Sequence, residues 1–191
     1  RLDSRRQNSV KMPLTCFVTV GSTRFDELTN EVLTGRVLSA LRKIGVSKLI
    51  VQIGAGELVS EKRKEIFGEG SGEFGEVSYK NFDVEIYRYR PTISKDISRA
   101  DVVIGHAGAG TILEALGARK PLIVVINERL MDNHQAELAE KLAASDHLLF
   151  CNISSLEATI LNPALFSLRQ FDPPSLEPAA RFIDRRAGVK F

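Results

Sequence analysis

Residues 101–117, DVVIGHAGAGTILEALG, constrain this chain more than any other stretch of the sequence. The apolar run at 102–104 is typical of a short strand, and a glycine-rich segment follows it directly. From Thr111 onward the apolar spacing predicts a helix. Glycines permit a close approach to the main chain, and the unpaired N–H groups at a helix start attract phosphate. The pattern indicates a phosphate site; a glycine loop that only joins a strand to a helix is the competing interpretation.

Two familiar glycine motifs do not fit this stretch. After Gly108 and Gly110, a dinucleotide-binding fingerprint needs its third glycine where this chain has Leu113. The pattern G-x-x-x-x-G-K-[ST] of P-loop proteins occurs nowhere in the sequence. The sequence therefore predicts neither a nicotinamide site nor a P-loop.

The composition favours one compact domain without a nucleic-acid role. The chain has 191 residues, of which 43% are hydrophobic and 26% charged, enough for one well-buried core. Its formal charge is +2, but residues 1–11 hold four basic residues and one acidic residue, so the remainder has 22 basic and 23 acidic residues. This balance gives no electrostatic reason to expect nucleic-acid binding.

The cysteines and the length of the apolar runs indicate the cellular compartment in which we expect the protein. Cys16 and Cys151 lie in separate apolar runs and suggest neither a disulfide framework nor a zinc site, so we expect a reducing, cytoplasmic setting without a bound metal. The longest apolar runs, such as 122–126, are far shorter than the roughly 18–20 residues that span a bilayer, and no signal-peptide pattern opens the chain. Any membrane role must come through a partner or a surface.

Strand-like and helix-like segments alternate along the chain. The predicted strands lie at 14–20, 48–53, 84–89, 102–104, 121–126 and 147–151, and the predicted helices at 28–41, 57–67, 93–99, 111–116, 133–144 and 154–161. Apolar strands alternating with helices predict an α/β, Rossmann-like parallel sheet with helices on both faces. Ligands of such sheets bind at the carboxyl ends of the strands. We expect Gly21, Gly54, Gly105 and Asn127 at that edge.

Both ends of the chain differ from the predicted domain, which covers residues 12–161. Residues 1–11 are polar and aperiodic, and we expect a disordered head or an expression remnant. Residues 162–191 contain four prolines but also apolar residues such as Phe166, Phe171 and Phe182. Such a segment is too apolar to remain without packing contacts, so we expect it to wrap around its own domain or to dock on another chain.

Three segments together resemble a known family. Residues 106–114 (HAGAGTILE), followed by Pro121 and by 132–136 (DNHQA), resemble the donor-binding signature of GT-B glycosyltransferases. Residues 17–26 (FVTVGSTRFD), combined with the glycine loop, are similar to the soluble subunits of the two-part UDP-N-acetylglucosamine transferases, which carry the glycosyltransferase family 28 C-terminal domain. The resemblance covers about residues 14–161 and implies the fold of the C-terminal half of a GT-B enzyme.

The resemblance implies a role for each matching residue. His106 contacts the donor diphosphate and is the one catalytic candidate, because it can stabilise the leaving group. Glu114 holds the ribose hydroxyls, and uracil lies against the main chain near 89–92. No metal or cofactor is implied, and UDP-N-acetylglucosamine is the donor substrate. The other implied binding residues are Gly21, Ser22, Thr23, Gly105, Gly108, Ala109, Gly110, Thr111, Asn133, His134 and Gln135.

The resemblance also implies a reaction and a partner. The family transfers N-acetylglucosamine, with inversion, to N-acetylglucosaminyl-diphosphodolichol, the second step of N-glycan precursor assembly. The chain has room for the donor half only, so the family implies a membrane-anchored, acceptor-binding partner that recruits the chain to the cytosolic face of the endoplasmic reticulum. We expect residues 162–191 to dock on that partner, which can also supply the general base that we do not find in this sequence.

Several of these sequence patterns can also be explained by a purely structural role. Thr111-x-x-Glu114 and Asp132-x-x-Gln135 also fit capping boxes, and the loop 21–23 is either a phosphate or acceptor site or an ordinary connection. We expect His147, which opens an apolar strand, to be structural. Two other functions stay open: a free-standing nucleotide-sugar enzyme of another α/β family, and a non-catalytic or regulatory nucleotide-sugar-binding module.

Overall fold

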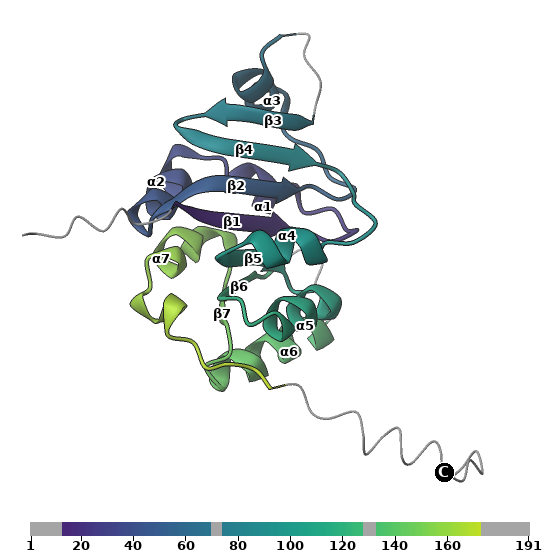
Figure 1. Ribbon diagram of the computed structural model, residues 1–191. Helices are drawn as coiled ribbons and strands as arrows, with labels where there is room; N and C mark the ends of the chain where they lie inside the picture. Colours follow the sequence, from purple (N-terminus) through teal and green to yellow (C-terminus); the bar gives the residue numbers. More distant parts are fainter. Residues whose placement is uncertain (1–12, 70–73, 128–132, 173–191) are drawn as a thin grey trace, which may run out of the picture.

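A computed structural model describes residues 13–69, 74–127 and 133–172 of the chain. These residues form one seven-stranded sheet in the order β3-β4-β2-β1-β5-β6-β7 (Figure 1). Neighbouring strands are parallel except for β3 and β4, which are antiparallel. The strands are β1 (Leu14–Thr19), β2 (Val46–Gln52), β3 (Gly75–Tyr79), β4 (Phe82–Tyr87), β5 (Val102–His106), β6 (Leu122–Val125) and β7 (Leu149–Cys151). The predicted Rossmann-like sheet is confirmed, with an antiparallel edge strand added.

Helices cover both faces of this sheet, as predicted. One face carries α1 (Asp26–Glu31), α2 (Gly35–Lys43), α3 (Ser60–Phe67), α7 (Leu156–Ile160) and the 3-10 helices η1 (Ile153–Ser155) and η2 (Pro163–Phe166). The other face carries α4 (Ser94–Arg99), α5 (Ala109–Gly117) and α6 (Asn133–Ala144). We call these the α1 face and the α5 face.

Each face has its own hydrophobic core. In β1, Cys16 and Val18 pack into the core of the α1 face, whereas Phe17 packs into the core of the α5 face, and all three are fully buried. Successive side chains of a strand point to opposite sides, so a continuous apolar run supplies both cores at once. This is why the central strands read as uninterrupted apolar segments.

The single helix predicted at 28–41 is wrong, because the chain forms two helices there. The backbone of Thr34 is extended, with φ −75° and ψ 152°, and its hydroxyl accepts a hydrogen bond from the Val37 N–H at 3.4 Å. The Thr34 hydroxyl also donates to the Glu31 carbonyl at 2.8 Å. Thr34 therefore caps α2 and ends the first helix, an effect that the apolar spacing alone hides.

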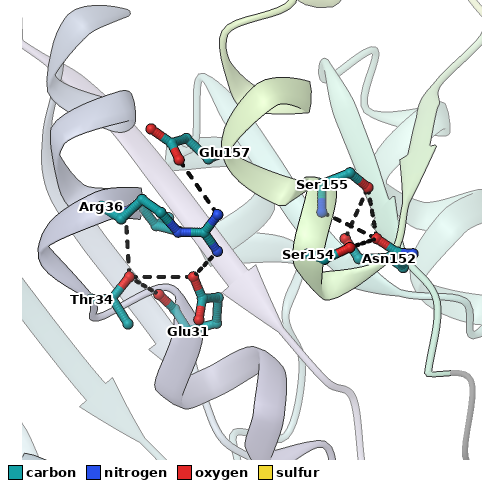
Figure 2. Close-up of polar contacts among 8 residues, drawn as sticks. Glu31, Thr34, Arg36, Asn152, Ser154, Ser155 and Glu157 are labelled. Atoms are coloured by element: carbon teal, nitrogen blue, oxygen red, sulfur yellow. Dashed lines mark hydrogen bonds and ion pairs between the residues drawn. The ribbon is translucent and has the colours of Figure 1, made fainter.

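An ion-pair brace holds the two short helices against α7. The Arg36 guanidinium lies 2.6 Å from the Glu31 carboxylate and 3.4 Å from that of Glu157 (Figure 2). Glu31 ends α1 and Glu157 lies in the first turn of α7. The brace thus connects three separate elements of the α1 face.

The edge strand β3 was missed by the sequence prediction. It pairs with β4 through the two-residue turn Lys80–Asn81, whose φ values of 49° and 62° are both positive. Such turns match the twist of a hairpin and most often contain Asn-Gly or Asp-Gly, which this chain lacks here. In β3 only Tyr79 is buried, so the strand has little apolar signal.

The beginning of the C-terminal segment packs on its own domain. Leu165 is completely buried in the core of the α1 face, and Leu168 contacts the same core. Phe171 contacts the other core and meets the His147 ring edge-on, with 5.4 Å between the ring centroids. Of the two interpretations of this segment, wrapping of its own domain holds for 162–172; residues 173–191, like 1–12, lie outside the described chain. No helix in the described residues is long and apolar enough to cross a membrane.

Replacing Leu165 with alanine should destabilise the domain by about 2–5 kcal/mol, because a buried leucine leaves a cavity. The adjacent Phe166 is 51% exposed and serves as the matched control, with an expected change within about 1 kcal/mol for Phe166→Ala. Chemical denaturation of both variants measures the difference. Equal free energies of unfolding would contradict the placement of Leu165 in the core.

Candidate active site

The loops that follow β1, β2 and β4 meet at the carboxyl edge of the sheet and hydrogen-bond to one another. The Ala55 N–H donates to the Thr23 carbonyl at 3.1 Å, and the Tyr89 hydroxyl donates to the Ser22 carbonyl at 3.3 Å. The Gly54 N–H donates to the Arg88 carbonyl at 3.2 Å. The structure thus brings the predicted loop 21–23 beside the segment that begins the predicted uracil region.

His106 lies between two glycines of different loops. A Cβ atom added to Gly21 would lie 2.8 Å from the imidazole Cε1, and one added to Gly108 would lie 2.3 Å from Nε2. The ring therefore packs directly on the bare main chain of both loops. Gly21 also has a φ of +62°, a conformation that glycine adopts without strain. The structure thus brings Gly21 and Gly108, two of the predicted binding residues, into contact with the ring of His106.

Burial disfavours the charged form of the His106 imidazole. Burial lowers the pKa of His106 below its ordinary value of 6.5, and the Thr19 backbone offsets only part of this shift. The Nδ1 atom is buried and forms no hydrogen bond of ordinary geometry within the described residues. Unsatisfied buried polar atoms are rare in folded proteins and often belong to functional sites. His106 is therefore a candidate for a functional role at this edge of the sheet.

Helix α5 begins without a side-chain cap. Its N-cap is Gly108, and the Ile112 N–H is the donor that reaches the Gly108 carbonyl, at 3.1 Å. The N–H groups of the first three helical residues, Ala109, Gly110 and Thr111, therefore have no acceptor within the helix. Ala109 and Gly110 are exposed. The helix start thus presents main-chain donors, together with the positive end of the helix dipole, at the carboxyl edge.

The capping-box interpretation of Thr111 and Glu114 is wrong. Thr111 lies inside the helix, buried, with its methyl group only 3.2 Å from where a Cβ of Gly105 would stand. Gly105 is therefore the residue that lets α5 pack closely on β5. Since Thr111 does not precede the helix, it cannot cap it.

Glu114 reaches toward the loop that follows β4. Its Oε1 accepts a hydrogen bond from the Ser94 hydroxyl at 2.7 Å, and Ser94 lies 2.7 Å from the Thr92 hydroxyl. Glu114 is half-buried in the second turn of α5. The structure therefore places the predicted ribose residue beside the predicted uracil segment.

A buried polar network that the sequence prediction missed anchors the same loop. The Tyr87 hydroxyl donates to Asp96 at 2.7 Å, and Arg90 pairs with Asp96 at 2.6 Å and with Glu85. Asp96 is completely buried, and burial together with Asp96 raises the pKa of Tyr87. The Arg90 guanidinium also lies 3.8 Å from the centroid of the Tyr87 ring. In the sequence, a short helix with alternating charges gives no sign that one aspartate is buried.

The predicted donor-sugar residues Asn133, His134 and Gln135 open helix α6, which follows β6 at the carboxyl edge. Their side chains, and all of Asp132, lie outside the described part of the chain. The second predicted capping box therefore stays a prediction.

The sequence matches the model of the glycosyltransferase family 28 C-terminal domain over residues 15–185. The chain belongs to this family. It is 44% identical over 135 residues to the human UDP-N-acetylglucosamine transferase subunit ALG13, covering 71% of this chain and 11% of the human protein. It is 35% identical over 164 residues to the subunit of that name from Cryptococcus neoformans, covering 78% of this chain and 82% of the fungal protein. The matched region is thus about a tenth of the human protein but most of the fungal one.

Solved structures show the same family fold. The chain resembles the NMR solution structure of ALG13 with a TM-score of 0.64 and 26% identity, covering 89% of this chain and 94% of that one. It resembles MurG from Acinetobacter baumannii with a TM-score of 0.62 and 21% identity, covering 91% of this chain and 50% of that one. The sheet and its helices therefore have the architecture of the C-terminal domain of a GT-B glycosyltransferase.

A pair of glycine substitutions tests the packing around the histidine of this family 28 domain. Gly108→Ala should destabilise the domain and shift the NMR signals of the His106 ring, because its Cβ would lie 2.3 Å from Nε2. Gly110 has no atom within 4 Å of an added Cβ, so Gly110→Ala should keep or raise stability, by about 0.5–1 kcal/mol. Thermal unfolding and histidine spectra of both variants provide the measurement. An unchanged His106 signal in Gly108→Ala would contradict the geometry.

Proposed function

We propose that this chain is the donor-binding, catalytic subunit of an inverting UDP-N-acetylglucosamine transferase. Its acceptor is N-acetylglucosaminyl-diphosphodolichol, and it is active only with a membrane-anchored partner. The observation that carries the proposal is the convergence of His106, the uncapped start of α5 and Glu114 on one edge of a family 28 domain. The printed names of the relatives, which describe UDP-N-acetylglucosamine transferase subunits, support the choice of donor.

In this proposal the donor lies along the carboxyl edge, from the loop after β4 to the start of α6. The main chain at 89–92 holds uracil, and Glu114 accepts hydrogen bonds from the ribose hydroxyls. The diphosphate lies against the N–H groups of Ala109, Gly110 and Thr111, which the helix dipole makes favourable for anions. Asn133, His134 and Gln135 then face the sugar.

Transfer breaks the bond between the sugar C1 and the diphosphate oxygen, so negative charge grows on UDP. Main-chain donors aimed at that oxygen stabilise the charge in the transition state without a metal or cofactor. A nearby anion favours the protonated imidazole and should raise the pKa of His106. His106 thus contributes most when the leaving group carries its full charge.

The partner supplies what a single GT-B half lacks. The printed names of the relatives describe subunits of a transferase, which supports a second polypeptide that carries the acceptor half. Because the acceptor is a lipid, the partner is membrane-anchored and recruits this cytoplasmic chain to the cytosolic face of the endoplasmic reticulum. The partner also supplies the general base that an inverting displacement requires.

The C-terminal segment docks on the partner in this proposal. Because Leu165 is buried in the domain core, a deletion from residue 162 would damage the fold as well as the docking segment. Deleting 173–191 keeps every contact described for 162–172. We expect that shorter chain to bind UDP-N-acetylglucosamine like the full chain but to lose co-purification with the partner. Undiminished co-purification would contradict docking through this segment.

Donor binding separates the proposal from its main alternative, a non-catalytic regulatory module whose vestigial pocket would bind UDP-sugar poorly or not at all. NMR titration of the isolated chain with UDP-N-acetylglucosamine should shift signals of residues 105–116. Glu114→Ala should weaken binding about 10–100-fold, because a charge-assisted hydrogen bond is worth about 1.5–3 kcal/mol. Glu140→Ala, a change of an exposed glutamate on α6, is the matched control.

An activity assay with UDP-N-acetylglucosamine, the lipid-linked acceptor and the partner tests the proposed transfer reaction. Turnover that needs both chains, and that falls in Glu114→Ala but not in Glu140→Ala, is the expected result. No donor binding in either setting would favour the non-catalytic module. Turnover by the isolated chain would instead favour a free-standing enzyme of another α/β family.

A further inference from the structure

The segment that joins β4 to α4 carries main-chain groups at the carboxyl edge that the fold itself does not use. No backbone hydrogen bond joins the N–H or carbonyl groups of Tyr89, Arg90 or Thr92 to another described residue. Tyr89 and Thr92 are exposed, so water or a ligand can reach this stretch. A uracil ring presents donors and acceptors along one edge, and the proposed function assigns it to the main chain at 89–92.

The side chain of Arg90 anchors this segment from inside the protein. Its guanidinium lies 2.6 Å from Asp96 Oδ1, pairs with Glu85 and lies 3.8 Å from the centroid of the Tyr87 ring. A planar guanidinium with several N–H donors can bind two carboxylates in a fixed direction. The position of the Arg90 main chain therefore depends on groups in β4 and α4.

These contacts converge on Asp96, which is completely buried in α4. Its Oδ1 faces Arg90 and lies 3.8 Å from the Arg99 guanidinium, while its Oδ2 accepts from the Tyr87 hydroxyl at 2.7 Å. Burial and then Asp96 raise the pKa of Tyr87, so the hydroxyl stays protonated and remains a donor. Both carboxylate oxygens are thus fixed by groups from three parts of the chain.

Stability alone does not explain a buried carboxylate at this position. Ile97 and Ala100 already pack α4 into the core of the α5 face, and apolar packing often stabilises a protein as much as a buried ion pair does. An ion pair differs from apolar packing because its hydrogen bonds also define a direction. The Asp96 contacts therefore suit the task of holding the segment in one exact conformation.

Helix α4 also reaches the residue proposed to hold the ribose. Ser94 begins the helix two residues before Asp96, and its hydroxyl donates to Glu114 Oε1 at 2.7 Å. The base and ribose contacts of the proposed donor site thus share one support, which Asp96 ties to the sheet through Tyr87.

We propose that Asp96 is a positioning residue for the donor base: through Arg90 and Tyr87 it fixes the main chain at 89–92 in the conformation that selects uracil. The inference rests on the proposed function, which assigns uracil to this segment. Uracil presents an N3–H donor beside carbonyl acceptors, whereas cytosine presents an N3 acceptor beside an amino donor. Main-chain groups separate these two patterns when they are held in place, because the wrong base then leaves polar groups unpaired.

Asp96→Asn and Tyr87→Phe test this role in the full chain, with UDP and CDP as the probes of an NMR titration. Asp96→Asn keeps the size of the side chain but removes the charge that holds Arg90. Tyr87→Phe removes one hydroxyl and keeps the ring beside the guanidinium. Asp101→Asn is the matched control, because Asp101 also accepts a hydrogen bond, from the Thr15 N–H at 2.8 Å, but at the amino edge of the sheet.

The measured quantity is the Kd for CDP divided by the Kd for UDP. We expect this ratio to fall about tenfold in Asp96→Asn and about threefold in Tyr87→Phe, since hydrogen bonds to a charged group are lost. The ratio in Asp101→Asn should equal that of the unaltered chain. A purely structural role would lower the melting temperature and the folded fraction, which changes both Kd values together and leaves their ratio unchanged.

The outcomes separate this inference from the proposed function. An unchanged ratio in Tyr87→Phe and in a folded Asp96→Asn, with UDP still bound, would overturn the positioning role and leave the proposed function standing. If Asp96→Asn does not fold, the ratio in Tyr87→Phe decides alone. Equal Kd values for UDP and CDP in the unaltered chain would also overturn the role, because no selection would exist. No binding of UDP by the unaltered chain would overturn both.

Discussion

Burial of both faces of the sheet is the constraint on which the rest of this molecule depends. Phe17 faces one core while Cys16 and Val18 face the other, so β1 has no exposed side along which a ligand could bind. Polar groups on such a strand must find partners inside the protein, as Thr19 and Gln52 do by hydrogen-bonding to each other near its end. Function is therefore confined to the loops at the carboxyl edge, where several loops of different length can meet.

Three arginines near that edge, all within the described residues, take part in ion pairs or hydrogen bonds. Arg24 pairs with Asp26, Arg90 pairs with Asp96, and Arg88 donates to the Gly54 carbonyl at 3.2 Å. These arginines are engaged in holding loops in place. The start of α5 and the ring of His106 lie at the same edge, and both respond to the charge of a ligand. This arrangement suits a substrate whose negative charge increases during the reaction.

The two faces of the sheet present different features at the carboxyl edge. The α5 face contributes the helix start and Glu114, and the buried Asp96 network fixes the loop that Glu114 approaches. The α1 face contributes a hollow of about 300 Å³ between the start of α1 and η1.

The sequence by itself determined the alternation of strands and helices, the two-faced sheet and the glycine loop before α5, because periodicity and glycine placement act over a few neighbouring residues. It also marked His106 and Glu114 as residues worth testing. Only the tertiary structure decided that Gly21 and Gly108 enclose one imidazole, that Thr111 is packed rather than capping, and that Leu165 belongs to the core. The β3 hairpin, the break at Thr34, the buried Asp96 and the hollow beside Glu27 likewise came from the structure. Each of these depends on contacts between segments far apart in the chain, whose energies no local pattern of residues records.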